Sequence, residues 1–210
     1  MCIVNKPSWS LGVEASDGDD FREVFDETLR TVEDATEVLD GRAFAVLGVH
    51  PGLVSKLLGR FGGPQNDEAV ERTEAVMKAG LDVAAEYVAE GRAVALKSGR
   101  PHYDVQEPTW EASNAVMEHA FELGSDLDCA VQLHTESAED FSDIRAMAEG
   151  AGMSPDRVVI VPASLLADLP DGSLRSIAVT SDDSAESKEL AYDLARRLAF
   201  PIYYSTTEPI

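Results

Sequence analysis

Short apolar runs alternate along the chain with longer segments in which apolar residues recur every three or four positions. The runs are Met1–Val4, Ala43–Val49, Ala93–Leu96, Cys129–Leu133, Val158–Val161 and Ile177–Val179. They are apolar throughout rather than alternating with polar residues, which is typical of strands buried on both faces of a parallel sheet. We therefore predict about six parallel strands from these runs.

Amphipathic segments between these runs predict helices. Four of them are Phe21–Leu39, Asp67–Ala89, Pro108–Leu123 and Ser184–Leu198, and in a further one, capped by Ser137, Phe141, Ile144, Met147 and Ala151 share a face. Asp17–Asp20 and Arg60–Asn66 are expected to be loops. Repeated alternation of strand and helix predicts right-handed βαβ units, whose chemistry gathers at the carboxyl ends of the strands.

The charge of the chain limits its partners. Lys and Arg total 17 against 39 Asp and Glu, so the 210 residues carry a net charge of −22. This charge argues against non-specific binding to nucleic acid and against docking on anionic membranes, since phosphates are repelled. An acidic surface of this kind fits a high-salt cytoplasm, where counterions screen repulsion within about 3 Å at molar salt. The alternative is a protein from a cytoplasm of ordinary salt concentration that has one acidic face.

No basic-then-apolar signal segment opens the chain, and no apolar run approaches about 18 residues, so we expect a cytoplasmic protein without a membrane span. Cys2 and Cys129 each lie in an apolar run and are expected to be buried free thiols rather than a disulfide.

Lys97 ends an otherwise apolar strand, where an amine is costly unless it is paired or functional. Burial lowers the pKa of a lysine and leaves more neutral amine for chemistry. The residue could be a Schiff-base nucleophile, a binder of phosphate or carboxylate, or a carbamylated metal bridge. A salt bridge to a nearby acid is the structural alternative.

Two histidines also follow apolar strands. His134 comes after Cys129–Leu133 and could present a neutral imidazole, a good ligand for zinc and similar ions, or make a structural hydrogen bond. His50 stands before Pro51, which favours extended backbone at the histidine. We expect His50 to hold a loop, with substrate contact as the alternative.

Further polar residues follow the first and third strands. Arg100 could clamp a phosphate or carboxylate through two parallel hydrogen bonds, and Tyr103 could cap the pocket by stacking. His102 lies between them. Together with Lys6 and Lys97, Arg100 would form a cationic island that concentrates a small anionic or phosphoester substrate.

The same strand ends carry a family resemblance. Gly48-Val49-His50-Pro51 resembles the G-[IV]-H-P element of the TatD family, and Val131–Thr135 resembles its apolar strand ending in His-[Ser/Thr]. Ala93–Gly99 occupies the place of the family's A-I-G-E-I-G segment. Asn5–Trp9 and Ser98–Tyr103 are further similar to archaeal TatD-related hydrolases, so the resemblance covers about residues 1–159.

The resemblance implies a TIM-barrel-like fold and hydrolysis of a phosphodiester or other ester-like bond by water bound to a divalent ion, which would be zinc, magnesium or manganese. It makes His134 a metal ligand. Lys97 and Arg100 would then be the catalytic residues, with Lys97 bridging the metals or positioning substrate and Arg100 holding an anionic group. His50, His102, Lys6 and Tyr103 would surround them.

Several family features are missing. The chain opens at what would be the second strand, without the H-x-H pair; Lys97 stands where the family has Glu; and Ile160-Val161-Pro162 replaces a histidine. The family's closing Asp strand has no counterpart, while Asp182 and Asp183 fit helix capping better than metal binding.

We therefore predict an α/β, incomplete TIM-barrel-like protein, with residues 1–162 as a partial barrel and 163–210 as a divergent α/β unit on the same domain. Its unpaired strand edges would favour homo-oligomers. We expect weak or no hydrolase activity, and the alternative function is a non-catalytic, anion-binding module.

Overall fold

The computed structural model describes residues 1–136, 138, 140–162, 177–180 and 202–205. The described strands form one parallel sheet in the order β5-β4-β3-β2-β1-β7-β6. The strands are β1 (Cys2–Val4), β2 (Phe44–Gly48), β3 (Ala95–Gly99), β4 (Ala130–Thr135), β5 (Val158–Pro162), β6 (Ile177–Thr180) and β7 (Ile202–Ser205).

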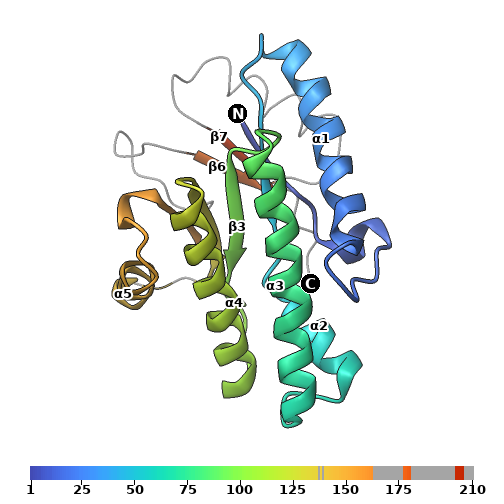
Figure 1. Cartoon of the computed structure of the whole chain (residues 1–210), viewed down its shortest axis with the longest axis vertical. Coiled ribbons are helices and arrows are strands. Elements are labelled where there is room, and N and C mark those ends of the chain that lie inside the picture. Colours follow the sequence, from blue (N-terminus) through green and yellow to red (C-terminus); the bar gives the residue numbers. More distant parts are fainter. Residues whose placement is uncertain (137, 139, 163–176, 181–201, 206–210) are drawn as a thin grey trace.

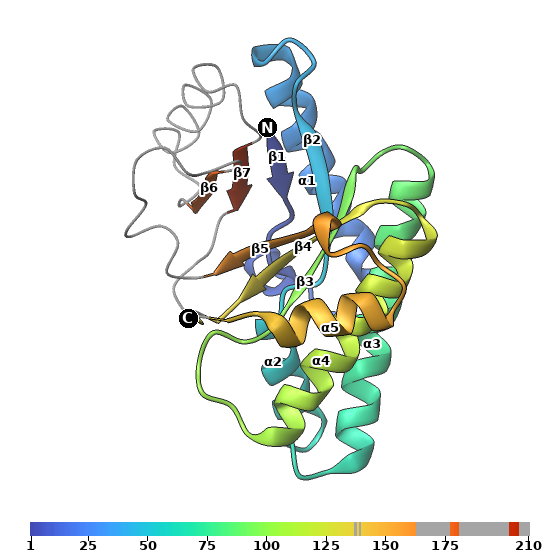
Figure 2. The same ribbon diagram turned by 90° about the vertical axis from the view of Figure 1, so that its left-hand side faces the viewer.

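The strand order is that of an open barrel. Strands follow one another in chain order from β1 to β5, and β7 returns to pair with β1, so β5 and β6 are the edges of the curled sheet (Figure 2). This order confirms the predicted incomplete TIM-barrel-like fold. All six predicted strands are present, and β7 is an additional one. The division at residue 163 and the homo-oligomer stay predictions.

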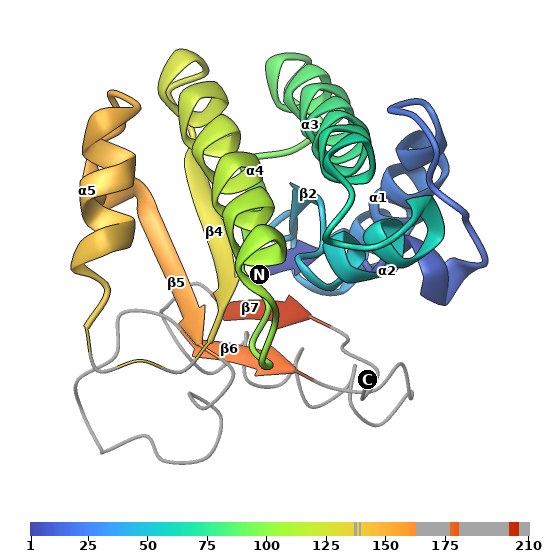
Figure 3. The same cartoon turned by 90° about the horizontal axis from the view of Figure 1, so that it is seen from below.

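Helices cover the outer side of the curled sheet (Figures 1 and 3). They are the short 3-10 helices η1 (Ser8–Leu11) and η2 (Pro155–Arg157), with α1 (Asp20–Val38), α2 (Gly52–Phe61), α3 (Asp67–Ala89), α4 (Glu107–Asp126) and α5 (Ser142–Gly150). Among the described residues, none of these helices has the length and apolar character needed to span a membrane.

Most helix predictions agree with the structure. The prediction for α3 has the observed bounds, and those for α1 and α4 differ only at their ends. Helix α2 was not predicted, and Arg60, expected in a loop, lies inside it. Helix α5 begins later than expected, where Asp140 accepts hydrogen bonds from the main chain and side chain of Ser142. The expected cap Ser137, the helix Ser184–Leu198, and Asp182 and Asp183 lie outside the described residues.

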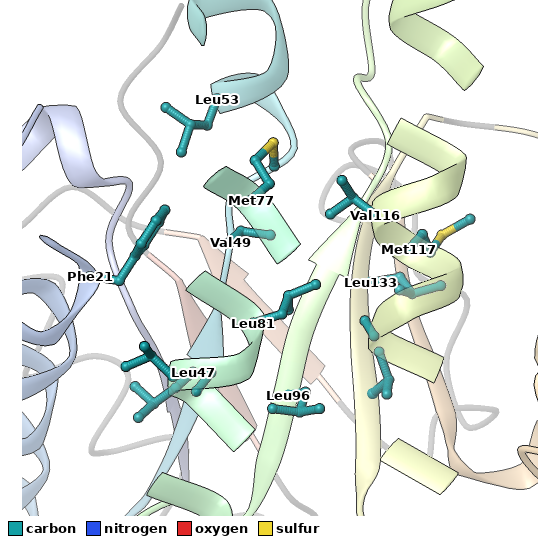
Figure 4. Close-up of a cluster of buried hydrophobic side chains, with 14 of the residues drawn as sticks. Phe21, Leu47, Val49, Leu53, Met77, Leu81, Leu96, Val116, Met117 and Leu133 are labelled. Atoms are coloured by element: carbon teal, nitrogen blue, oxygen red, sulfur yellow. The ribbon is translucent and has the colours of Figure 1, made fainter. Parts of the chain in front are cut away.

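The main core fills the space between the sheet and the helices (Figure 4). Side chains alternate across each strand, so Leu47 and Leu96 face the helices while Val46 and Ala95 face the inside of the curl, where they form a small second cluster. The outer layer includes Phe21, Met77, Leu81, Val116, Met117 and Leu133. Both cysteines are free thiols, as predicted; Cys129 is buried and Cys2 half-buried.

Candidate functional site

The carboxyl ends of β3 and β4 carry polar residues on the inner face of the curled sheet, the face turned away from the helices. Gly99 pairs with His134 and Lys97 with Gln132, so these residues share the face that holds Ala95. Both strands run further than the sequence predicted. Lys97, expected to end its strand, lies inside β3, and His134, expected to follow its strand, lies inside β4. The glycine is required, since a Cβ at Gly99 would lie 1.9 Å from the His134 main-chain oxygen.

Lys97 is the buried cation of this site. Its side chain is 2% exposed, and its Nζ donates to the main-chain oxygen of Asn5 over 3.3 Å. Burial away from water lowers its pKa from 10.5 to about 7. At neutral pH the amine is therefore populated in both its charged and its neutral form.

Asn5 fixes the position of the lysine's acceptor, a role that the sequence did not reveal. The Asn5 side chain accepts from the Gly48 N–H over 2.8 Å and donates to the Gly48 oxygen over 3.0 Å. It also donates to the main-chain oxygen of Lys6 over 3.0 Å. Asn5 thus ties the end of β1 to the end of β2, directly beside Lys97.

His50 is buried next to this lysine. Its Nδ1 accepts from the Gly52 N–H over 3.1 Å, so the start of α2 holds the ring, and the edge of the Trp9 ring lies 5.2 Å away between centroids. The pKa of His50 falls well below its ordinary value, first because the ring is buried and then because Lys97 and the neighbouring histidines repel a second charge. The contact with Gly52 ties His50 to the start of α2, and the predicted role of His50 in the site stays a prediction.

His134 and His102 form a contacting pair. The Nε2 of His134 lies 3.2 Å from the Nδ1 of His102, and the rings meet edge to face at 5.0 Å. The His50 ring lies 5.6 Å from that of His134. Burial, with the charge of Lys97, lowers the pKa of His134 to about 3, so its imidazole is neutral at physiological pH.

Tyr103 and Lys6 lie at the border of this cluster. The Tyr103 hydroxyl donates to Ser55 Oγ over 2.8 Å and so ties the segment after β3 to α2, while its ring meets His102 edge-on. Lys6 follows Asn5 at the end of β1. Their predicted contact with substrate stays a prediction.

Arg100 is directed to the other face of the sheet. Its guanidinium is 2% exposed, donates to Asp143 Oδ2 over 2.7 Å, lies 3.6 Å from Glu136 Oε1 and stacks over the Trp110 ring. The strand alternation that places Lys97 on the inner face places Arg100 between α4 and α5. These are the contacts of an internal ion pair, and the predicted binding of an anionic group by Arg100 stays a prediction.

The inner-face cluster offers imidazole and amine nitrogens as donors. Among the described residues, no group of three or more His, Cys, Asp or Glu side chains is arranged to hold a metal ion. His134 and His102 are suitable donors, but zinc sites usually take three protein ligands. The described residues therefore do not form a complete divalent-metal site.

Two other features escaped the sequence analysis. Gln132 pairs with Lys97 on the inner face, and its Oε1 is buried without a hydrogen-bond partner among the described residues. Helix α2 supplies Gly52 and Ser55 to the site. Its apolar residues Leu53, Val54, Leu57 and Leu58 recur at helical spacing, and this was the signal that could have revealed it.

Comparisons with known proteins agree with this architecture. The family model described as TatD related DNase matches residues 10–160. An uncharacterized protein of Methanocaldococcus jannaschii is 32% identical over 164 residues, which are 76% of this chain and 53% of that protein. The chain thus spans about half the length of this curated relative.

Among solved structures, the chain is similar to the crystal structure of SacUVDE, with a TM-score of 0.39 and 12% identity over 98% of this chain and 92% of the other. The family model covers most of the chain, including β2, β3 and β4, the strands that position the Lys97 cluster. The chain belongs to the TatD related DNase family.

Proposed function

We propose that this chain is a TatD-type hydrolase that cleaves a phosphodiester or another ester-like bond in a small anionic substrate. The observation that supports it is the gathering of Lys97, His50, His102 and His134 at the carboxyl ends of neighbouring parallel strands. Active sites of (β/α) barrels lie at that end of the strands. As part of the same proposal, the protein works in a high-salt cytoplasm, where its charge of −22 is screened.

Lys97 binds the substrate in this proposal. Its ammonium form contacts an anionic oxygen of the phosphoester and neutralises the charge that grows there as water attacks and the ester bond breaks. Because the amine is buried, this attraction acts in a low-dielectric surrounding, where it is stronger than at the surface.

The histidines position the attacking water. His134 stays neutral at physiological pH, so a ring nitrogen can accept a hydrogen bond from water. His102, whose ring contacts that of His134, is exposed. Water and substrate therefore approach the pair from the side of His102.

The TatD family is generally dependent on divalent metal ions. A bound ion lowers the pKa of water and polarises the phosphoryl oxygen. His134 remains the proposed ligand, with zinc, magnesium or manganese as the ion, although the described residues lack a complete ligand set. Calorimetric titration with each ion tests whether His134 is a ligand. Metal binding that survives His134→Gln contradicts this assignment.

Hydrolysis of bis(p-nitrophenyl) phosphate in molar KCl, with each metal ion in turn, tests the activity. We expect Lys97→Met to lower kcat/KM by about 100-fold or more, the usual effect of losing one charge-stabilising group. Lys78→Met is the matched control, because Lys78 pairs with Glu74 on α3, away from the site. Turnover no faster than in buffer, or full activity in Lys97→Met, rejects the proposal.

The second candidate is a non-catalytic module that binds a small anion. The buried ammonium of Lys97, in a cluster that forms no complete metal site among the described residues, favours it. Calorimetry with inorganic phosphate in the presence of EDTA separates the two functions. Binding that requires Lys97 without any turnover supports the module, whereas turnover supports the enzyme.

A further inference from the structure

A cavity of about 310 Å³ lies between η1, the segment after it and α2, next to the Lys97 cluster but outside it. Its volume is at the lower end of those of small-molecule pockets, roughly 300–1,000 Å³. Trp9 and Val13 line one side of the cavity, and the buried residues Leu53 and Leu57 of α2 line the other. The cavity is therefore largely apolar and of a size for a small ligand.

Helix α2 also brings two cations to this cavity. Lys56 and Arg60 line it together with Leu53 and Leu57, and the spacing of these four positions places them on one face of the helix. The Lys56 Nζ lies 4.9 Å over the Trp9 ring, and the Arg60 guanidinium donates to the main-chain oxygen of Ala15. Both charges are thus held at the wall of the cavity.

The charge of the cavity is opposite to that of the whole chain. Of the described residues that line it, Glu14, which is exposed, is the single acidic one, against the two cations. Within the described part of the chain, neither Lys56 nor Arg60 makes a salt bridge to a carboxylate. Asp20 is near Arg60, since its pKa is lowered first by hydrogen bonds from Ser16 and also by the charge of Arg60. On a protein of net charge −22, a pocket lined by two cations and by apolar side chains would attract an anion.

We propose that this cavity binds a small organic anion, with a phosphate or carboxylate group held by Lys56 and Arg60. The apolar or aromatic body of the ligand lies against Leu53, Leu57 and Trp9. Neither the anionic group nor the apolar body alone suffices for tight binding. An inorganic anion leaves the apolar walls without a contact, and a neutral ring leaves the two cations without an anion.

Trp9 separates the cavity from the proposed hydrolytic site. Its ring lines the cavity and also meets the His50 ring edge-on at 5.2 Å. Gly52 permits this contact, since a Cβ there would lie 3.2 Å from His50 Nδ1 and 3.4 Å from the Trp9 ring. Binding in the cavity does not require Lys97, so this inference stands whether or not the chain hydrolyses an ester.

Trp9 also provides the measurement. In a Trp110→Phe background it is the one remaining tryptophan, and its fluorescence reports on the cavity. Phenyl phosphate is titrated with EDTA present, beside inorganic phosphate, phenol and benzoate. We expect phenyl phosphate to bind at least about ten-fold more tightly than inorganic phosphate or phenol, which corresponds to 1.4 kcal/mol or more. Benzoate distinguishes the two head groups. If benzoate binds as tightly as phenyl phosphate, the cavity accepts a carboxylate; if benzoate does not bind, a phosphate group is required.

Charge removal locates the binding. Lys56→Gln with Arg60→Gln should weaken phenyl phosphate at least about ten-fold. Lys78→Gln with Arg145→Gln removes the same charge from α3 and α5 and should leave affinity unchanged. Since loss of the Arg60 contact with Ala15 can disturb the fold, Val13→Phe provides a second variant that fills the cavity, keeps both cations and should also abolish binding.

Three outcomes overturn the proposal. Phenyl phosphate that binds no better than inorganic phosphate shows that the apolar walls do not contribute to binding. Affinity retained in the Lys56→Gln, Arg60→Gln variant shows that these two cations do not hold the anionic group. Affinity lost in Lys97→Met places the ligand in the Lys97 cluster instead of the cavity.

Discussion

The Nζ of Lys97 donates to the main-chain oxygen of Asn5 over 3.3 Å, although 92 positions separate the two residues in the chain. The contact joins the end of β3 to the end of β1 across β2, which lies between them in the sheet. A carbonyl oxygen satisfies one of the three N–H groups of an ammonium but does not neutralise its charge. The lysine is therefore held in place while its charge remains available to a ligand.

Replacement of Lys97 by Met should stabilise the protein in neutral and acidic solution. The native pKa of about 7 lies below the unfolded value of 10.5, so the penalty for burying the charge is complete below pH 7 and disappears as pH rises from 7 to 10.5. The shift corresponds to an upper limit of about 5 kcal/mol. Denaturant unfolding at pH 6.5 and 9.5 should show the advantage of Lys97→Met shrinking with pH. An advantage independent of pH would contradict the assigned burial.

His134 should remain neutral well below pH 6.5. Its native pKa of about 3 means that, between pH 6.5 and 3, the unfolded chain binds a proton that the native ring does not. Stability therefore falls as the pH drops through this window, and His134→Gln should reduce that fall. NMR titration of the ring checks the protonation state, with the chain in concentrated guanidinium chloride as the reference. A native midpoint near 6 would exclude the buried position.

Asn5→Ala should destabilise the protein by about 1–3 kcal/mol, since it leaves the buried Gly48 N–H without its partner. Asn114→Ala provides the matched control on α4, because the buried Oδ1 of Asn114 has no hydrogen-bond partner among the described residues. Its effect should stay within about 0.5 kcal/mol. Chemical denaturation of the two variants measures the difference, and equal losses would show that Asn5 does not join β1 to β2.

The Arg100–Asp143 pair should show a coupling free energy of about 1–3 kcal/mol in a double-mutant cycle with Arg100→Met and Asp143→Ala. Removal of Asp143 leaves a buried guanidinium whose other carboxylate partner among the described residues, Glu136, is 3.6 Å away. The exposed pair Arg145–Glu149 is the control and should couple by less than about 0.5 kcal/mol. Equal coupling in both pairs would contradict an internal role for Arg100. Loss of substrate binding without loss of stability in Arg100→Met would favour the anion clamp.

The strands and most helices could be predicted because their signals are local. A continuous apolar run such as Ala43–Val49 has few alternatives to a buried strand, and the apolar spacing of Asp67–Ala89 gave α3 its observed bounds. Helix α2 was missed because it is short and follows Pro51 directly, without a separate start signal after the strand. The resemblance to the TatD family added the curl of the sheet, which periodicity alone does not distinguish from an open parallel sheet.

The candidate site was predicted in part. Lys97, His50, His102 and His134 are brought together as the parallel order of the strands required. Arg100 was placed with them because it follows the same strand, but residues of opposite parity in a strand lie on opposite faces. A shift of one position moves a side chain from the inner face to the helix layer, and strand ends are the least certain part of any sequence prediction.

The sequence by itself determined the order of strands and helices, the net charge of −22 and the identity of the polar residues at the strand ends, because these depend on composition and short-range spacing. Tertiary structure decided which face each residue occupies, that Asn5 joins β1 to β2 beside Lys97, and that Lys56 and Arg60 line a cavity with Trp9. The physical reason is that burial, pKa and pairing depend on contacts between segments far apart in the chain, and those contacts exist only once the sheet has formed.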